Sequence, residues 1–92
     1  MIPKTLKIGG HRYRVLVVPK LDNEAMGRHS REDCEISISS NQSDSQAQET
    51  LLHEIIHAIQ PAFSEETIEF LSLSLFQVLS DNKLDFSLRG KH

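Results

Sequence analysis

The sequence predicts an α+β fold in which a small antiparallel β-sheet of two hairpins is packed by a two-helix hairpin. Three observations predict it. The chain has 92 residues, which is the length of one small domain. Up to about residue 42, short stretches of alternating apolar and polar residues are separated by Gly, Pro and Asp, whereas later apolar residues follow a helical period. We therefore expect one domain over residues 1–92, with strands within about 4–39 and helices at about 45–60 and 65–80.

The first predicted hairpin joins residues 4–8 to residues 11–18. Gly9-Gly10 between the two stretches is a strong turn signal. Alternate residues in the second arm share one apolar face, namely Tyr13, Val15 and Val17.

The second predicted hairpin is more polar and joins residues 26–30 to residues 35–39. Residues 31–33, Arg-Glu-Asp, are its predicted turn. Ile36 and Ile38 are two positions apart in the second arm, so they supply the buried face of this hairpin.

Two helices follow, each with a predicted N-cap. Ser45 and Gln48 have the spacing of a capping box, and Pro61 limits the first helix to about residue 60. Ser64 is the predicted N-cap of the second helix. Residues after Asn82 are weakly patterned, and we expect them to fray.

Charge and cysteine content exclude several classes of protein. Ten Lys and Arg against thirteen Asp and Glu give a net charge of −3, so binding of nucleic acid through its phosphates is not expected. The single cysteine, Cys34, excludes an intrachain disulfide and a thiolate-rich zinc finger, and fits a reducing compartment. No signal-peptide core is evident, and the longest aliphatic run is residues 15–18. We therefore expect a cytoplasmic protein that does not enter a membrane.

His53, Glu54 and His57 form an H-E-x-x-H motif inside the first predicted helix. Four residues make about one helical turn, so both histidines project from one face and can share a tetrahedral zinc ion. Glu54 lies about 100° round the helix from His53, where it can flank the metal and accept a proton from bound water. The same polar stripe is also typical of a solvated helix surface, so both interpretations stay open.

The second predicted helix supplies candidates for a third metal ligand. It is apolar on most sides, yet Glu69 stands between two large apolar residues, where a carboxylate needs a partner or a cation. If the helices are antiparallel about a turn centred near Ala62, Glu69 is level with the midpoint of the two histidines. Glu65 and Glu66 lie about 4.5 to 6 Å nearer the turn and suit the first turn of a helix. We predict Glu69 as the ligand, with Glu65 or Glu66 as alternatives.

Two segments together resemble a known family. Residues 48–59, QETLLHEIIHAI, followed by residues 65–72, EETIEFLS, resemble small phage and prophage zinc metallopeptidase-like proteins, which are related in pattern to ImmA/IrrE-like and SprT-like zincins. The opening, IPKTLKIGG at residues 2–10, is similar to the first strand of that phage group. The similarity touches most of the chain, and its specific part is the H-E-x-x-H segment.

The resemblance implies a minimal zincin-like fold and a site in which His53, His57 and Glu69 bind zinc while Glu54 is the general base. Two features depart from the family pattern. Twelve positions separate His57 from Glu69, fewer than in the larger ImmA/IrrE-like enzymes. Ser72-Leu73 stands where a pair of small residues often follows the downstream glutamate.

Three functions remain open from the sequence. The first is a zinc-dependent metallopeptidase or amidohydrolase that hydrolyses a peptide bond with metal-activated water, its substrate pairing along the edge of the second hairpin. The second is a non-catalytic zincin-like module of phage or mobile-element origin that binds a protein, which the small size favours and the retained Glu54 disfavours. The third is a structural α+β protein. Tyr13 and His29 are candidates for stabilising an oxyanion, although a lone tyrosine on a strand is more often a core residue and a lone histidine in a turn is more often solvated.

Overall fold

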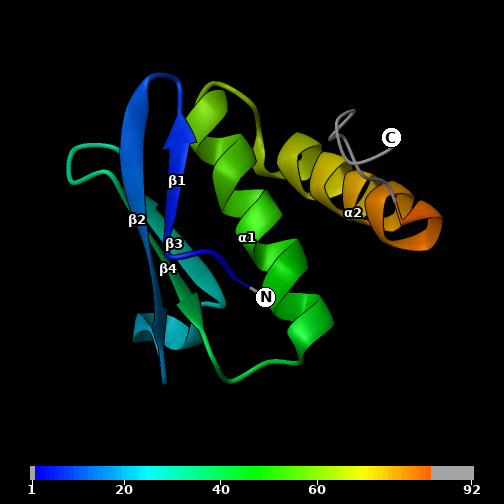
Figure 1. Cartoon of the computed structure of the whole chain (residues 1–92), viewed down its shortest axis with the longest axis horizontal. Coiled ribbons are helices and arrows are strands. Elements are labelled where there is room, and N and C mark those ends of the chain that lie inside the picture. The colour runs from blue at the N-terminus through cyan, green and yellow to red at the C-terminus, as the bar shows by residue number, and fades with distance from the viewer. Residues whose placement is uncertain (1, 84–92) are drawn as a thin grey trace, which may run out of the picture.

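The computed structural model describes residues 2–83, which contain four strands and two helices (Figure 1). The elements are β1 (Thr5–Ile8), β2 (His11–Val18), the 3-10 turn η1 (Asp22–Glu24), β3 (Gly27–Ser30), β4 (Glu35–Ser39), α1 (Asp44–Ile59) and α2 (Glu65–Asn82). The predicted α+β class is confirmed. The fraying expected after Asn82 concerns residues that lie almost wholly outside the described part of the chain.

The sheet is mixed, so the prediction of a purely antiparallel sheet is wrong at one pairing. The strand order is β1-β2-β4-β3, and the pairs β1–β2 and β3–β4 are antiparallel, as in two hairpins. However, β2 and β4 are parallel, with Val15 opposite Ile36. The chain passes from β2 to the edge strand β3 and then returns with β4 between them. Because the chain reverses twice on this path, β4 regains the direction of β2.

The turn of the first hairpin has a backbone conformation that favours glycine at both positions. Gly9 and Gly10 have φ angles of +57° and +86°. A two-residue hairpin turn with positive φ at both positions matches the right-handed twist of the flanking strands. It brings Ile8 opposite His11 and so fixes the register of β1 on β2.

Helix α1 begins two residues earlier than the predicted cap indicates. The N-cap is Ser43, whose hydroxyl accepts a hydrogen bond from the backbone of Gln46, while the Gln46 side chain accepts from the backbone of Ser43. Ser45 and Gln48 have the same S-x-x-Q spacing, so the motif alone does not distinguish the two starts. The cap of α2 is Ser64, as predicted.

The core lies between the sheet and α1, which covers one face of the sheet (Figure 1). Ile36 and Ile38 are both 0% exposed, which confirms the predicted buried face of the second hairpin. The other buried members of this core are Ile8, Tyr13, Val15, Leu51 and Ala58. Burial of this apolar surface holds α1 against the strands.

Helix α2 lies on the side of α1 away from the sheet (Figure 1). Among the described elements it packs on α1 alone, through a face that includes the fully buried Ile68 and Ser72. Its other sides remain open, and Phe70 and Leu73 are 69% and 51% exposed. The sequence of α2 is apolar on most sides, but among the described residues its burial is found on one face. Neither helix in residues 2–83 is both long and apolar enough to cross a membrane.

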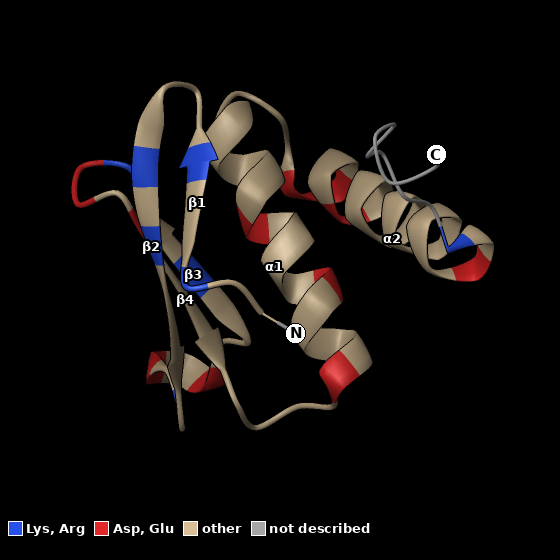
Figure 2. Ribbon diagram, viewed as in Figure 1, with Lys and Arg blue, Asp and Glu red and all other residues tan. Residues whose placement is uncertain are grey.

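Lys and Arg are unevenly distributed between the two layers (Figure 2). Among residues 2–83, those other than Lys83 lie on the strands or in the segments next to them, where acidic residues are also present, whereas α1 and α2 contain acidic residues and no Lys or Arg. The first basic residue after the sheet region is Lys83, just beyond the end of α2. The helical layer therefore has a negative field that favours a cation over an anion.

Candidate metal centre

Helix α1 presents His53 and His57 side by side near its C-terminal end. They are one turn apart, and their ring centroids are 4.9 Å from each other. Both side chains are largely buried, at 20% and 15% exposure. The predicted projection of both imidazoles from one helix face is therefore present in the structure.

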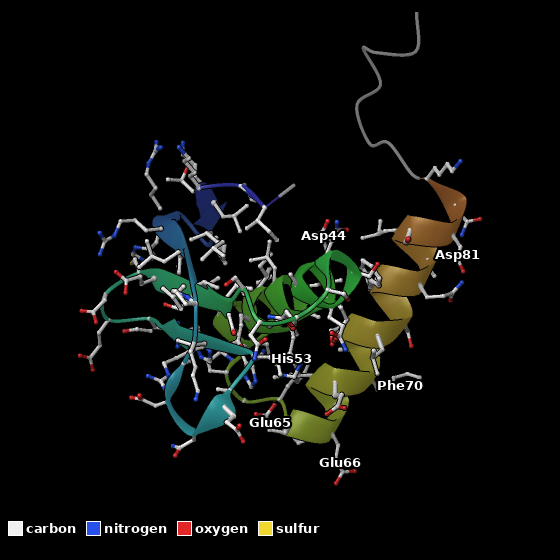
Figure 3. The ribbon with its side chains drawn as sticks, turned by 90° about the horizontal axis from the view of Figure 1, so that it is seen from below. Asp44, His53, Glu65, Glu66, Phe70 and Asp81 are labelled. Carbon is white, nitrogen blue, oxygen red and sulfur yellow. The ribbon has the colours of Figure 1, made fainter. Side chains whose placement is uncertain are left out.

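Glu65, the first residue of α2, completes a group of three. Its Oε1 lies 3.2 Å from His53 Nε2 and 2.9 Å from His57 Nε2. Figure 3 shows His53 and Glu65 close together, while Glu66 and Phe70 point outward. Within residues 2–83, this is the group of His, Cys, Asp and Glu side chains close enough to hold a metal ion, with ligand atoms within 4.8 Å of one another. Ligands about 2.0–2.1 Å from a tetrahedral zinc ion lie about 3.3 Å apart, so the spacing suits one such ion.

The histidines also lower the pKa of Glu65. Burial raises the pKa of its carboxyl. The hydrogen bond from His57 and the charges of His57 and His53 lower this pKa, and together they outweigh the effect of burial. The resulting pKa lies below the ordinary value of 4.5. Glu65 is therefore an anion near neutral pH, which is the state that a metal ligand needs.

The structure brings Glu65 to the histidines instead of Glu69, the residue first predicted. Ser72 Oγ donates to Glu49 Oε2 at 3.1 Å, which makes these two positions level across the helix pair. The hairpin is therefore centred between residues 60 and 61, about one and a half residues before the assumed centre at Ala62. With this centre, the first turn of α2 lies opposite the two histidines. Glu69, one turn further along, is exposed and lines the adjacent cavity.

Glu54 is buried between α1 and the sheet and is not in the group of three. It is 7% exposed, and its Oε1 lies 2.7 Å from Nδ1 of His29 on β3. It lines a cavity of about 330 Å³ together with His53, Glu65 and Glu69. The carboxylate therefore stands beside the candidate ligands, as the H-E-x-x-H spacing predicts, but it also has a partner from the sheet.

The two candidates for oxyanion stabilisation lie in different places. Tyr13 is 4% exposed in the core and does not line the cavity that contains Glu54. His29 lies within the site, where its ring stacks on His57 with centroids 4.9 Å apart and planes at 19°. The sequence offers His29 as an oxyanion candidate, but it does not place His29 beside Glu54 or His57. Alternation along residues 27–30 puts His29 on the same face as Gly27, but it does not identify the helix that this face meets.

Together these features define the class of site as a candidate two-histidine, one-carboxylate metal centre beside a buried glutamate. Comparisons with protein-family models, with curated proteins and with solved structures give no match to this chain. The function is therefore argued from the site itself.

Proposed function

We propose that this protein is a zinc-dependent hydrolase of peptide or related amide bonds, with His53, His57 and Glu65 as metal ligands. The main support is the convergence of these three side chains, whose ligand atoms lie within 4.8 Å of one another, beside the buried carboxylate of Glu54. Two imidazoles and one carboxylate are a donor set that zinc hydrolases use, and three protein ligands leave a fourth position for substrate chemistry.

Glu54 is the proposed general base. It is next to His53 in the chain and lines the same cavity as His53 and Glu65, yet it is not among the ligand atoms. When bound, zinc polarises a carbonyl group and lowers the pKa of water in its open position. In the proposed reaction Glu54 accepts the proton of the attacking water and returns it to the leaving amine.

The cavity and the neighbouring edge strand give the proposed substrate its place. Met26 and Leu73 add apolar surface to the cavity, which at about 330 Å³ holds one or two side chains rather than a folded partner. β3 is an edge strand, so its outward backbone groups can pair with an extended peptide. We therefore propose an extended protein or peptide segment as the substrate.

The metal is tested first. Purified protein should contain about one zinc per chain by elemental analysis after loading and desalting. The double variant His53→Ala/His57→Ala should contain none. His11→Ala is the matched control, because His11 is an exposed histidine on β2 outside the ligand group. Unchanged zinc in the double variant would show that the site is elsewhere.

Hydrolysis is tested with Glu54→Gln on a synthetic peptide library, with cleavage read by mass spectrometry. This variant should retain zinc, since Glu54 is not a ligand, and should lose cleavage because the base is gone. Glu66→Gln is the matched control, because it removes the same charge from a side chain that points outward (Figure 3). A zinc-loaded wild-type protein that cleaves no peptide yet binds one tightly would favour the non-catalytic binding module.

A further inference from the structure

One face of β3 lies against the buried side of α1, and its two inward residues both meet Glu54. Alternation along the strand puts Gly27 and His29 on this face, with the exposed Arg28 on the other. Neither residue belongs to the H-E-x-x-H motif, and β3 joins the site only through tertiary packing of the sheet on α1.

His29 gives Glu54 its hydrogen-bond partner. The distance from His29 Nδ1 to Glu54 Oε1 is 2.7 Å, and the Glu54 side chain is only 9% exposed. A carboxylate removed from water to this extent is costly without a donor, so the bond fixes where Glu54 lies. Only one of the two carboxylate oxygens is engaged in this bond.

Gly27 gives the second oxygen its space. A Cβ atom at Gly27 would lie 3.0 Å from Glu54 Oε2 and 2.5 Å from Cγ2 of Thr50. No real side chain accepts the second distance, so β3 and α1 approach this closely only because residue 27 has no side chain. Gly27 also lines the cavity that Glu54 shares with His53 and Glu65.

We propose that Gly27 and His29 position the general base: His29 holds Oε1 of Glu54, and Gly27 leaves Oε2 free to accept the proton in the cavity. This inference rests on the proposed hydrolase function and adds two residues from β3 to it. His29 acts through Glu54 and does not touch the reacting atoms, so it is a positioning residue. Proton transfer requires heavy atoms about 2.6–3.2 Å apart, and a displacement of about 1 Å costs about 100-fold in rate.

His29 also contacts a proposed metal ligand, so the test must separate an effect on Glu54 from an effect on zinc binding. Its ring stacks on His57, a proposed ligand, with centroids 4.9 Å apart. Loss of His29 therefore has two separable consequences, a displaced base and a looser ligand. Zinc content reports the second, whereas turnover per bound zinc reports the first.

The experiment compares His29→Asn with His29→Leu in the zinc-loaded full chain. Asparagine keeps an N–H donor near the place of Nδ1, and leucine fills similar volume without a donor. Turnover of a library peptide that the wild type cleaves, expressed per bound zinc, should fall about 10- to 100-fold in His29→Leu with KM unchanged. His29→Asn should recover most of it, and His11→Leu on β2 should match the wild type. Gly27→Ala should lower turnover per zinc as His29→Leu does.

A measurement without substrate accompanies the kinetics. In metal-free protein, the shifts in urea midpoint caused by His29→Leu and Glu54→Gln should be non-additive, because the two side chains form one contact. Additive shifts, equal turnover in His29→Asn and His29→Leu, or a loss confined to zinc content would each overturn the positioning role. Failure of the proposed function differs from these outcomes, because it appears as a zinc-loaded wild type that cleaves nothing. That outcome removes the positioning role too, and non-additive midpoints then identify a purely structural pair.

Discussion

Helices α1 and α2 both carry proposed ligands, but the rest of the molecule holds them differently. α1 packs on β1, β3 and β4 on one side and on α2 on the other. α2, among the described elements, packs on α1 alone and leaves Phe70 69% exposed. His53 and His57 are therefore fixed by the sheet-backed helix, whereas Glu65 depends on a single helix–helix contact and on its bonds to the histidines.

This difference indicates what a bound ion would change. The two histidines already project side by side from α1, so an ion would alter their positions little. Glu65 is the proposed ligand on α2, so an ion would add one more connection between the helices. Binding energy of this kind stabilises the arrangement that binds. The site therefore has a fixed half, His53 and His57 on α1, and a dependent half, Glu65 on α2, and substitutions in the two halves should have different effects.

The largest expected effect is on the free energy of unfolding, and it differs between the sheet core and the exposed side of α2. Ile36 is 0% exposed in the core, so Ile36→Ala should lower the free energy of unfolding by about 2–5 kcal/mol. Phe70→Ala, which removes a larger but exposed side chain, should change it by no more than about 0.5 kcal/mol. Urea unfolding of both variants measures this. A large loss for Phe70→Ala would show that α2 is covered in solution.

The second-largest expected effect is a loss of zinc affinity when Glu65, the proposed ligand on α2, is removed. Outer partners of metal ligands are worth about 10- to 100-fold in affinity, so removal of a ligand in Glu65→Ala should cost about 100-fold or more. Glu69→Ala should cost only a few-fold, because Glu69 lines the cavity outside the ligand group. Competition for zinc with a chromophoric chelator measures both. The reverse ranking would make Glu69 the ligand.

Removal of either N-cap should have a smaller effect on stability, and it should distinguish α2 from α1 in zinc binding. Ser64 is the N-cap of α2 and is next to Glu65; its Oγ accepts a hydrogen bond from the backbone of Thr67 at 3.2 Å. Ser43 is the N-cap of α1, at the end of that helix far from the two histidines. Ser64→Ala and Ser43→Ala should each lower the free energy of unfolding by about 1 kcal/mol. Only Ser64→Ala should also weaken zinc binding, as measured by the same competition. Equal effects on zinc would show that both helices are equally fixed.

The smallest effect is a dependence of stability on pH in metal-free protein. The pKa of Glu65 is lower in the folded state than its ordinary value of 4.5, since His57 and His53 outweigh the effect of burial. Its contribution to stability is therefore present above pH 4.5 and is lost as the pH falls through the lowered value. Glu65→Gln should lose this part of the acid dependence, and urea midpoints at several pH values below neutrality measure it. The Glu65 side chain is 72% exposed, so salt should reduce the difference.

Much of the fold follows from local pattern, and the main exception is a long-range strand pairing. Gly9-Gly10 identified the first turn, and the alternation of Ile36 and Ile38 identified the buried face of the second hairpin. Alternation assigns faces to a strand but not neighbours, so the parallel pairing of β2 with β4 was not predictable from it. The start of α1 differed because two overlapping S-x-x-Q segments satisfy the same capping rule.

The site divides in the same way. His53 and His57 were predictable because one helical turn separates them, and nothing beyond α1 is needed to bring them together. Glu65, and not Glu69, lies beside the histidines because of where the turn between the two helices is centred. A shift of this centre by one or two residues changes which glutamate faces them. His29 reaches Glu54 across 25 positions of chain through sheet packing, a contact that neither periodicity nor spacing predicts.

The insertion of β4 between β2 and β3 has a consequence for how the chain folds. Each hairpin closes through contacts near in sequence, but the pairing of Arg14 with Glu35 joins segments 21 positions apart. Non-local pairings of this kind bear the entropy of loop closure and slow folding. Because His29 lies on β3 and Glu54 lies on α1, the two side chains meet only when β3 has packed on α1, a contact across 25 positions of chain. The H-E-x-x-H helix brings His53 and His57 together by itself, whereas the complete site requires the packing of the strands on α1.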